Sequence, residues 1–150
     1  MKFYNSVNSN WKVMGIDSII IEKLTIPSSL TSLVLVESLI DRVCNTIHVN
    51  EDVYGNVLIG VTEAVNNAII HGNLFSDSKT VSIEVSEDES SFYFRISDEG
   101  LGFDYLNLPD PTAPENIEKE NGRGIFLIKN LADELIYENN GASAIIVFNK

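Results

Sequence analysis

Glu63 and Asn67 are the residues of this chain whose types and spacing point most directly to chemistry. At this spacing on a helix they lie one turn apart on the same face, with Asn66 beside them. The positions around them are mostly apolar, so a carboxylate and two amides there cost free energy unless they are paired or face a ligand. The pattern allows Glu63 to orient or deprotonate an attacking group while the Asn67 oxygen binds a hard cation such as Mg²⁺. The alternative is an ordinary surface face of a helix.

A second group, the segment DEGLG at residues 98–102, follows a predicted strand. Glycines at alternate positions let the backbone approach a flat or charged ligand, and the carboxylate of Asp98 can accept a hydrogen bond from an exocyclic amine. The alternative is an ordinary glycine-rich turn. The segment is not a dinucleotide-binding fingerprint, because no helical pattern follows Gly102.

A third group, GRG at residues 122–124, stands at the start of a predicted helix. Exposed amides at a helix N-terminus attract phosphate, and Arg123 adds a cation in an otherwise acidic chain. The alternative is that this segment is an ordinary turn that caps the helix and binds no ligand.

The pattern of the rest of the chain predicts an α+β framework for these groups. Strands are predicted at 18–26, 79–85, 90–97, 134–138 and 142–148, and helices at about 30–48, 52–71 and 124–133. We expect Ser28 or Ser29 to cap the first helix and Asn50 the second. Residues 1–15 show no clear periodicity, and residues 100–124 are predicted to form a long loop or a short irregular helix, as active-site lids often do. The strands 79–85 and 90–97 are expected to pair with one solvent-exposed face, and such elements form two-layer sandwiches.

Length and composition fit one globular domain spanning residues 1–150, with 44% hydrophobic and 21% charged residues. The single cysteine, Cys44, excludes an internal disulfide and fits a reducing compartment, so we expect a cytoplasmic protein. No apolar run approaches the roughly 20 residues that cross a bilayer, and the N-terminus lacks a signal-peptide core. The formal charge of −12 disfavours nucleic acid and anionic membranes as partners and favours a protein with a basic surface.

The order and placement of the three groups resemble the N box and the two glycine boxes of the ATPase domain shared by gyrase, a heat-shock chaperone, sensor histidine kinases and MutL (the GHKL superfamily). The segments EAVNNAIIHG, DEGLGFD and NGRGIFLI are most similar to the small bacterial anti-sigma factor serine kinases of partner-switching pathways. The resemblance covers about residues 19–148. It implies a two-layer α/β sandwich of the GHKL (Bergerat) ATP-binding type, with a mixed, mainly antiparallel sheet covered by helices on one face.

The resemblance also implies binding of ATP with Mg²⁺ and a role for each matched residue. Glu63 is the implied catalytic base, Asn67 the implied Mg²⁺ ligand and Asp98 the implied adenine-reading carboxylate. Gly100 and Gly102 are implied to shape the adenine pocket. The residues implied to lie at the triphosphate under the lid are Gly122, Arg123 and Gly124. His71 is interpreted as a structural residue or a contact at the edge of the nucleotide rather than as a phospho-acceptor.

The implied function is that of an ATP-dependent protein serine/threonine kinase acting as an anti-sigma factor. It phosphorylates a small anti-sigma factor antagonist of the STAS type and sequesters a sigma factor, and a homodimer is expected. The alternative is an ATP-binding anti-sigma or regulatory adaptor with little or no kinase activity. A third class, a stand-alone ATP hydrolase, predicts turnover without a protein acceptor and usually carries transducer domains. A sensor histidine kinase is not expected, because the chain has no room for a separate dimerisation and phospho-acceptor domain.

Overall fold

The computed structural model describes residues 10–13, 15–108, 110, 112–116 and 123–150. Its strands are β1 (Asn10–Val13), β2 (Ile16–Pro27), β3 (Thr80–Glu87), β4 (Ser91–Ser97), β5 (Glu134–Glu138) and β6 (Ser143–Asn149). Its α-helices are α1 (Leu33–Thr46), α2 (Glu51–Asn67) and α3 (Arg123–Leu131). Each predicted strand and helix is present, whereas β1 was not predicted.

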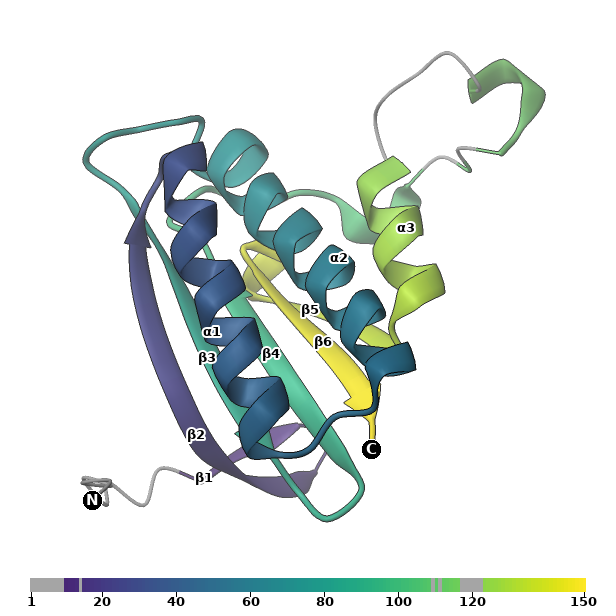
Figure 1. Ribbon diagram of the computed structural model, residues 1–150. Coiled ribbons are helices and arrows are strands. Elements are labelled where there is room, and N and C mark those ends of the chain that lie inside the picture. Colours follow the sequence, from purple (N-terminus) through teal and green to yellow (C-terminus); the bar gives the residue numbers. More distant parts are fainter. Residues whose placement is uncertain (1–9, 14, 109, 111, 117–122) are drawn as a thin grey trace.

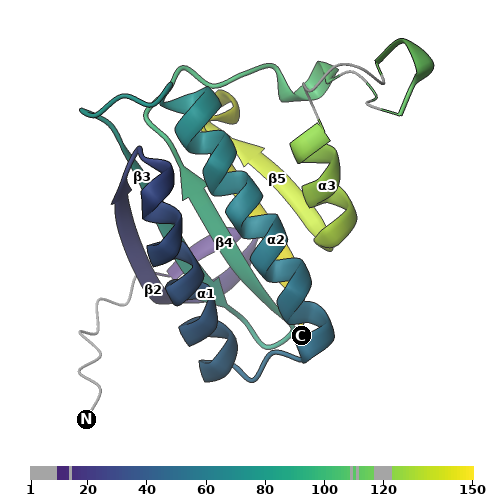
Figure 2. The same ribbon diagram turned by 45° about the horizontal axis from the view of Figure 1, so that its top comes forward.

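The described strands form one six-stranded sheet in the order β1-β2-β3-β4-β6-β5. Every neighbouring pair in it is antiparallel. The three α-helices lie side by side on one face of this sheet, with α2 in the middle (Figures 1 and 2). The structure therefore confirms the predicted α+β sandwich covered by helices on one face, whereas the predicted mixed sheet is wrong among the described strands, since all of their pairs are antiparallel.

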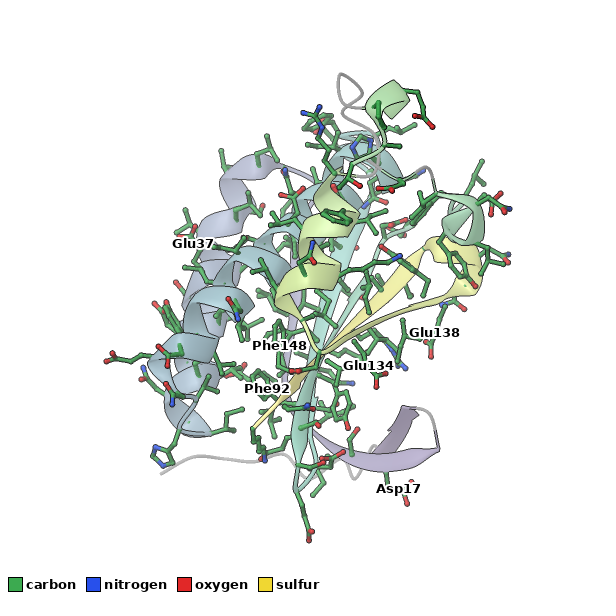
Figure 3. The ribbon with its side chains drawn as sticks, turned by 90° about the vertical axis from the view of Figure 1, so that its right-hand side faces the viewer. Asp17, Glu37, Phe92, Glu134, Glu138 and Phe148 are labelled. Atoms are coloured by element: carbon green, nitrogen blue, oxygen red, sulfur yellow. The ribbon has the colours of Figure 1, made fainter. Side chains whose placement is uncertain are left out.

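The main hydrophobic core lies between the helices and the sheet. Its contribution from α1 includes Val36, Leu39, Ile40 and Val43, which are all at most 1% exposed. From the sheet, the rings of Phe92 on β4 and Phe148 on β6 stack with centroids 5.4 Å apart, and Figure 3 shows both close to the helix layer. Opposite them, Glu37 lies on the outer side of α1 and is exposed (Figure 3). The apolar stripes of the helices thus determine how each helix is oriented on the sheet, and therefore which of its polar side chains can face the predicted site.

The prediction of a solvent-exposed second face is wrong for β4. Tyr93 is 3% exposed and packs with Ile145 and Val147 on the face away from the helices. Beside them Arg95 forms an ion pair with Glu138 at 3.3 Å. β4 is a central strand, so its polar-looking alternate positions are covered from both neighbouring strands.

The two predicted helix caps have different outcomes. The Asn50 side chain accepts a hydrogen bond from the backbone N–H of Asp52 at 3.0 Å, which confirms the cap of α2. The prediction for the first helix is wrong, because neither Ser28 nor Ser29 makes a side-chain cap and α1 is preceded by a short 3₁₀ turn. Ser28 is instead buried and donates its hydroxyl hydrogen to the carbonyl of Lys79 at 2.8 Å. Across the described residues, every helix is too short or too polar to span a bilayer.

The segment after β4 is irregular, as predicted, over the residues that the structure describes. In its described part it contains two short 3₁₀ turns, η3 (Tyr105–Asn107) and η4 (Pro114–Asn116). The first of these turns lies beside the N-terminal end of α3 in both ribbon views (Figures 1 and 2). Two of the three predicted site groups therefore lie at the two ends of this segment. DEGLG follows β4, and Gly124 of the GRG group lies at the start of α3.

Candidate functional site

A cavity of about 640 Å³ lies between the end of α2, the loop after β4 and the start of α3. Its volume is within the range of about 300–1,000 Å³ that is usual for small-molecule sites. The residues that line it come from α2 and the turn after it, from β4 and its loop, from α3, and from the β5–β6 hairpin. Polar or glycine residues among them include Glu63, Asn66, Asn67, His71, Gly72, Asp98, Gly102, Asp104, Asn107 and Gly124.

Glu63 and Asn67 face the first turn of α3 at one end of this cavity. A methyl group built on Gly124 would lie 2.3 Å from Oε1 of Glu63 and 3.2 Å from Nδ2 of Asn67. Both side chains are half-buried. Glycine at position 124 leaves room for the Glu63 carboxylate beside α3, and a larger residue there would require that carboxylate to move. The helix start and the two polar side chains therefore form one polar wall.

The two neighbours of this pair differ in what they can offer a ligand. The hydroxyl of Thr62 donates to the carbonyl of Leu58 at 2.6 Å, so its hydrogen is used within the helix. Asn66 is half-buried and lines the cavity. α2 therefore presents to the cavity three side chains whose oxygen atoms can bind a cation, namely Asn66, Asn67 and Glu63.

Asp98 lies at another part of the cavity wall, packed against Gly72. Its Oδ1 accepts a hydrogen bond from the backbone N–H of Gly100 at 2.8 Å, and its own N–H donates to the carbonyl of Ala142 at 2.9 Å. Burial raises the pKa of the Asp98 carboxyl, while the Gly100 amide and the charge of Lys79 oppose this rise. The side chain is thus fixed through Oδ1, and Oδ2 is the oxygen left to meet a ligand N–H.

The turn that follows α2 is a π-helix, η2 (Ala68–Gly72), so the α-helix ends at Asn67 and not at His71 as predicted. Within this turn the N–H of Asn73 donates to the carbonyl of Ala68 at 2.8 Å. A π-type turn holds an extra residue and is frequent at functional sites. The wider turn brings Gly72 beneath Asp98 and leaves His71 exposed at the cavity edge.

An apolar wall of the cavity was missed by sequence reasoning. It is formed by side chains from three neighbouring strands and from α3, namely Ile96, Ala144, Tyr137 and Ile128, with Phe103 from the loop. Ile96 and Tyr137 both pair with Ala144 across the sheet, and the rings of Phe103 and Tyr137 meet edge to face at 5.1 Å. Burial raises the pKa of Tyr137 to about 12, so its hydroxyl stays neutral. Strand alternation places Tyr137 on the face of Leu135, which was the available signal.

The structure brings most of the predicted site residues together. Those that line the cavity are Glu63, Asn67, Asp98, Gly102 and Gly124. Gly100 packs just behind it, since a methyl group built there would lie 2.2 Å from the carbonyl oxygen of Gly72. Arg123 begins α3 with an exposed side chain and does not line the cavity. Gly122 lies outside the described residues.

The chemistry of the donors also limits what kind of metal ion the site can hold. Among the described residues, no group of three or more His, Cys, Asp or Glu side chains could hold a metal ion. Mg²⁺ prefers oxygen ligands and usually takes only one or two from protein, with phosphates and water supplying the rest. Glu63, Asn66 and Asn67 therefore fit a Mg²⁺ ion that is shared with a phosphate-bearing ligand, and they do not form a complete metal site by themselves.

Comparison with known proteins gives three similarities. A family model described as the histidine kinase-like ATPase domain matches residues 26–150. The serine-protein kinases RsbW of Staphylococcus aureus strains JH9 and Newman are each 30% identical to this chain over 133 residues, with 81% of either chain covered. The crystal structure of the RsbU and RsbW domains of a Mycobacterium tuberculosis protein matches 86% of this chain with a TM-score of 0.55 and 11% identity. The match spans 31% of that longer chain and supports the fold.

Proposed function

Since this chain belongs to the histidine kinase-like ATPase domain family, we propose that it is an ATP-binding protein serine/threonine kinase that acts as an anti-sigma factor in the cytoplasm. The proposed substrate is a small antagonist protein of the STAS type, and its phosphorylation leaves the sigma factor sequestered. The observation that carries the proposal is that Glu63, Asn67 and Asp98 line a single cavity of about 640 Å³. The serine-protein kinases among its relatives support the reaction class.

The cavity has the two kinds of wall that ATP requires. The apolar side chains of Ile96 and Tyr137 suit a flat base, and Asp98 can accept a hydrogen bond from its exocyclic amine. At the polar wall, the first-turn amides of α3 and the donors of α2 suit phosphate groups and their cation. In the proposed pose the adenine lies against Asp98 and the phosphates extend toward Glu63 and Gly124.

The residues of this chain have distinct proposed roles in phosphoryl transfer. Bound Mg²⁺ would neutralise and orient the phosphate oxygens. The Asn67 amide oxygen is the proposed protein ligand of that ion, and the α3 amides hold the phosphates. Glu63 accepts the proton of the serine or threonine hydroxyl of the antagonist while the hydroxyl oxygen bonds to the γ-phosphorus and ADP leaves. Glu63 is suited to this role because its carboxylate lies at the polar wall. Arg123 begins α3, where its positive charge favours the triphosphate end.

Transfer to a protein acceptor distinguishes this proposal from the adaptor alternative. The test is incubation of the chain with γ-labelled ATP, Mg²⁺ and the antagonist encoded nearest to it, followed by detection of label on the antagonist. Labelled antagonist supports the kinase. Tight nucleotide-dependent complex formation without any label on the antagonist contradicts the kinase and supports the adaptor.

Replacing Asn67 by Ala is expected to weaken Mg²⁺-dependent ADP binding by at least about tenfold, because the variant loses the proposed metal ligand. The measurement is calorimetric titration of ADP in the presence of Mg²⁺ and in the presence of EDTA. Asn130→Ala is the matched control, since the Asn130 amide donates to the Phe126 carbonyl within its own exposed turn of α3. If the Asn67 variant keeps the full difference between Mg²⁺ and EDTA, Asn67 is not the ligand.

The raised pKa of Asp98 predicts a pH dependence for base discrimination. The folded-state pKa of Asp98 lies above the unfolded value of about 3.9, so the folded chain binds more protons than the unfolded chain between these two pKa values. The contribution of Asp98 to the free energy of unfolding therefore falls as the pH rises through this range. Adenine binding has the opposite dependence, because the exocyclic amine donates a stronger hydrogen bond to an ionised carboxylate than to a neutral carboxyl group. We therefore expect the preference for ADP over GDP to increase as the pH rises from about 3.9 through the raised pKa of Asp98.

The ratio of the two dissociation constants is measured for the natural chain and for Asp98→Asn. Phosphate protonation cancels between the nucleotides, and protonation of the adenine ring affects both chains alike. In Asp98→Asn the ratio is expected to be smaller and to change less with pH. Equal pH dependence of the ratio in the two chains contradicts the role of Asp98 as an ionised acceptor.

A further inference from the structure

We infer that Asn73 is a positioning residue that holds Asp98 at the place where it distinguishes adenine from guanine. The inference rests on the proposed nucleotide site and assigns to it a residue that does not line the cavity. Asn73 directly follows the π-helical turn of α2 and is fully buried, with 0% of its surface exposed. A buried amide of this kind requires hydrogen-bond partners for both its N–H groups and its oxygen.

Asn73 satisfies this requirement by joining three separate segments. Its Nδ2 donates to the Ser28 hydroxyl at 2.7 Å and to the Thr80 carbonyl at 2.9 Å. Its Oδ1 accepts the backbone N–H of Glu99 at 2.8 Å. The side chain thus connects the end of β2, the start of β3 and the loop after β4, and both of its amide hydrogens are used.

The partners of Asn73 are themselves held to the same region. The Ser28 hydroxyl donates to the carbonyl of Lys79 at 2.8 Å, and the backbone N–H of Thr80 donates to Oε2 of Glu99 at 2.6 Å. Residue 99 is therefore bound through its backbone by Asn73 and through its side chain by the first residue of β3. These contacts make the loop after β4 part of the rigid sheet rather than a free connection.

Asp98 lies between two backbone anchors. Its own N–H is bound to the carbonyl of Ala142, and the next N–H along the chain, that of Glu99, is bound to Asn73. With both anchors in place, the peptide on each side of Asp98 is fixed, and Oδ1 is further held by Gly100. Removal of the Asn73 side chain releases the Glu99 N–H, so that of the two backbone anchors only the one from Ala142 remains, beside the side-chain contacts of Glu99 with Thr80 and of Asp98 with Gly100.

This arrangement matters for the choice of base more than for general affinity. Adenine offers an amine where guanine offers a carbonyl oxygen, and a carboxylate rewards the first and repels the second only if its oxygen is held at hydrogen-bond distance. In the proposed pose the phosphates lie at the polar wall of Glu63, Asn67 and Gly124, a different part of the cavity lining from this loop. Loosening Asp98 should thus reduce ADP binding and relieve the penalty against GDP.

The test compares Asn73→Ala and Asn73→Ser with a matched control, Ser86→Ala. The serine variant keeps a hydroxyl near β2 and β3 but is too short to reach the Glu99 N–H, so it serves if the alanine variant does not fold. Ser86 is 0% exposed and accepts a hydrogen bond from Ser18 at 3.1 Å, so Ser86→Ala also removes a buried hydrogen bond, at a residue that does not line the cavity. For each chain, the dissociation constants of ADP and GDP with Mg²⁺ and the midpoint of thermal unfolding are measured.

The natural chain is expected to prefer ADP, and the Asn73 variants are expected to lose about tenfold or more of that preference, which corresponds to one hydrogen bond to a charged group. Ser86→Ala is expected to lose stability and keep the natural ratio. Amide hydrogen exchange should become faster in the 98–100 segment of the Asn73 variants and stay unchanged there in the control.

Two results overturn the inference while leaving the proposed function in place. They are an unchanged ADP-to-GDP ratio in the Asn73 variants, and an equal loss of affinity for both nucleotides, which indicates a merely structural role. Absence of nucleotide binding by the natural chain is a different outcome, since it contradicts the proposed function itself and the inference with it.

Discussion

Glu63→Gln is expected to reduce phosphoryl transfer to the antagonist by about 10²- to 10⁴-fold, the usual contribution of a general base. Glutamine keeps the shape of the side chain but cannot take up the proton of the attacking hydroxyl. The carboxylate it replaces is within close contact of the α3 start, where a methyl group on Gly124 would lie 2.3 Å from Oε1. Because the amide fills the same space, ADP affinity should change by no more than about threefold, or less than 1 kcal/mol.

The measurement is single-turnover transfer from γ-labelled ATP to the antagonist, with ADP affinity determined in parallel. Glu37→Gln is the matched control, since it removes the same charge from the exposed outer side of α1 (Figure 3). Transfer that continues at the natural rate in the Glu63 variant overturns the assignment of the base. A loss of transfer accompanied by an equal loss of ADP affinity assigns Glu63 to binding instead.

Gly72→Ala is expected to remove most of the ADP affinity and to lower the free energy of unfolding by about 1–3 kcal/mol, as overpacking of a buried site usually does. The added methyl group would lie 2.3 Å from Cγ and Oδ2 of Asp98. The carboxylate cannot simply turn aside, since its Oδ1 is bound by Gly100 and its backbone by Ala142. Either Asp98 leaves its place or the π-helical turn shifts, and both changes disturb the adenine end of the cavity.

Gly55→Ala provides the control for this substitution within the same helix. A methyl group at position 55 of α2 would meet nothing within 4 Å. Alanine is favoured over glycine in a helix by about 0.5–1 kcal/mol, so this variant should be slightly more stable and bind ADP normally. Calorimetric titration and thermal unfolding of both variants give the comparison. Natural ADP affinity in Gly72→Ala contradicts the close packing of Asp98 on this turn.

The regular elements of this protein were accessible from the sequence because their signals are local. The apolar stripe of α2 repeats at helical spacing, and β3 and β4 alternate, so their types follow from neighbours within a few residues. The cap of α2 is similarly local, since Asn50 binds an amide two residues away. Through resemblance to a family, motif order then identified polar and glycine residues of the cavity lining, namely Glu63, Asn67, Asp98, Gly102 and Gly124.

Other features depended on which distant segments fold together. Ser28 is of a residue type that often caps helices, yet its hydroxyl donates a hydrogen bond to the carbonyl of Lys79, the residue before β3. The apolar wall with Tyr137 exists only because β4, β6 and β5 pair in that order. The buried second face of β4 has the same origin. No window of sequence contains these partners, so propensity and periodicity could not predict them.

The sequence by itself therefore determined the elements other than β1 and the π-helical turn, together with the family and the residue types of the site, because helix and strand signals and short motifs are contiguous. Only the tertiary structure decided that Gly124 lies against Glu63, that Gly72 packs against Asp98 and that Asn73 binds the loop after β4. In the sequence, Asn73 is simply a polar residue after a glycine, of the kind that ends many helices. Its hydrogen bonds reach residues 45 positions before it and 26 after it, and burial makes those bonds obligatory.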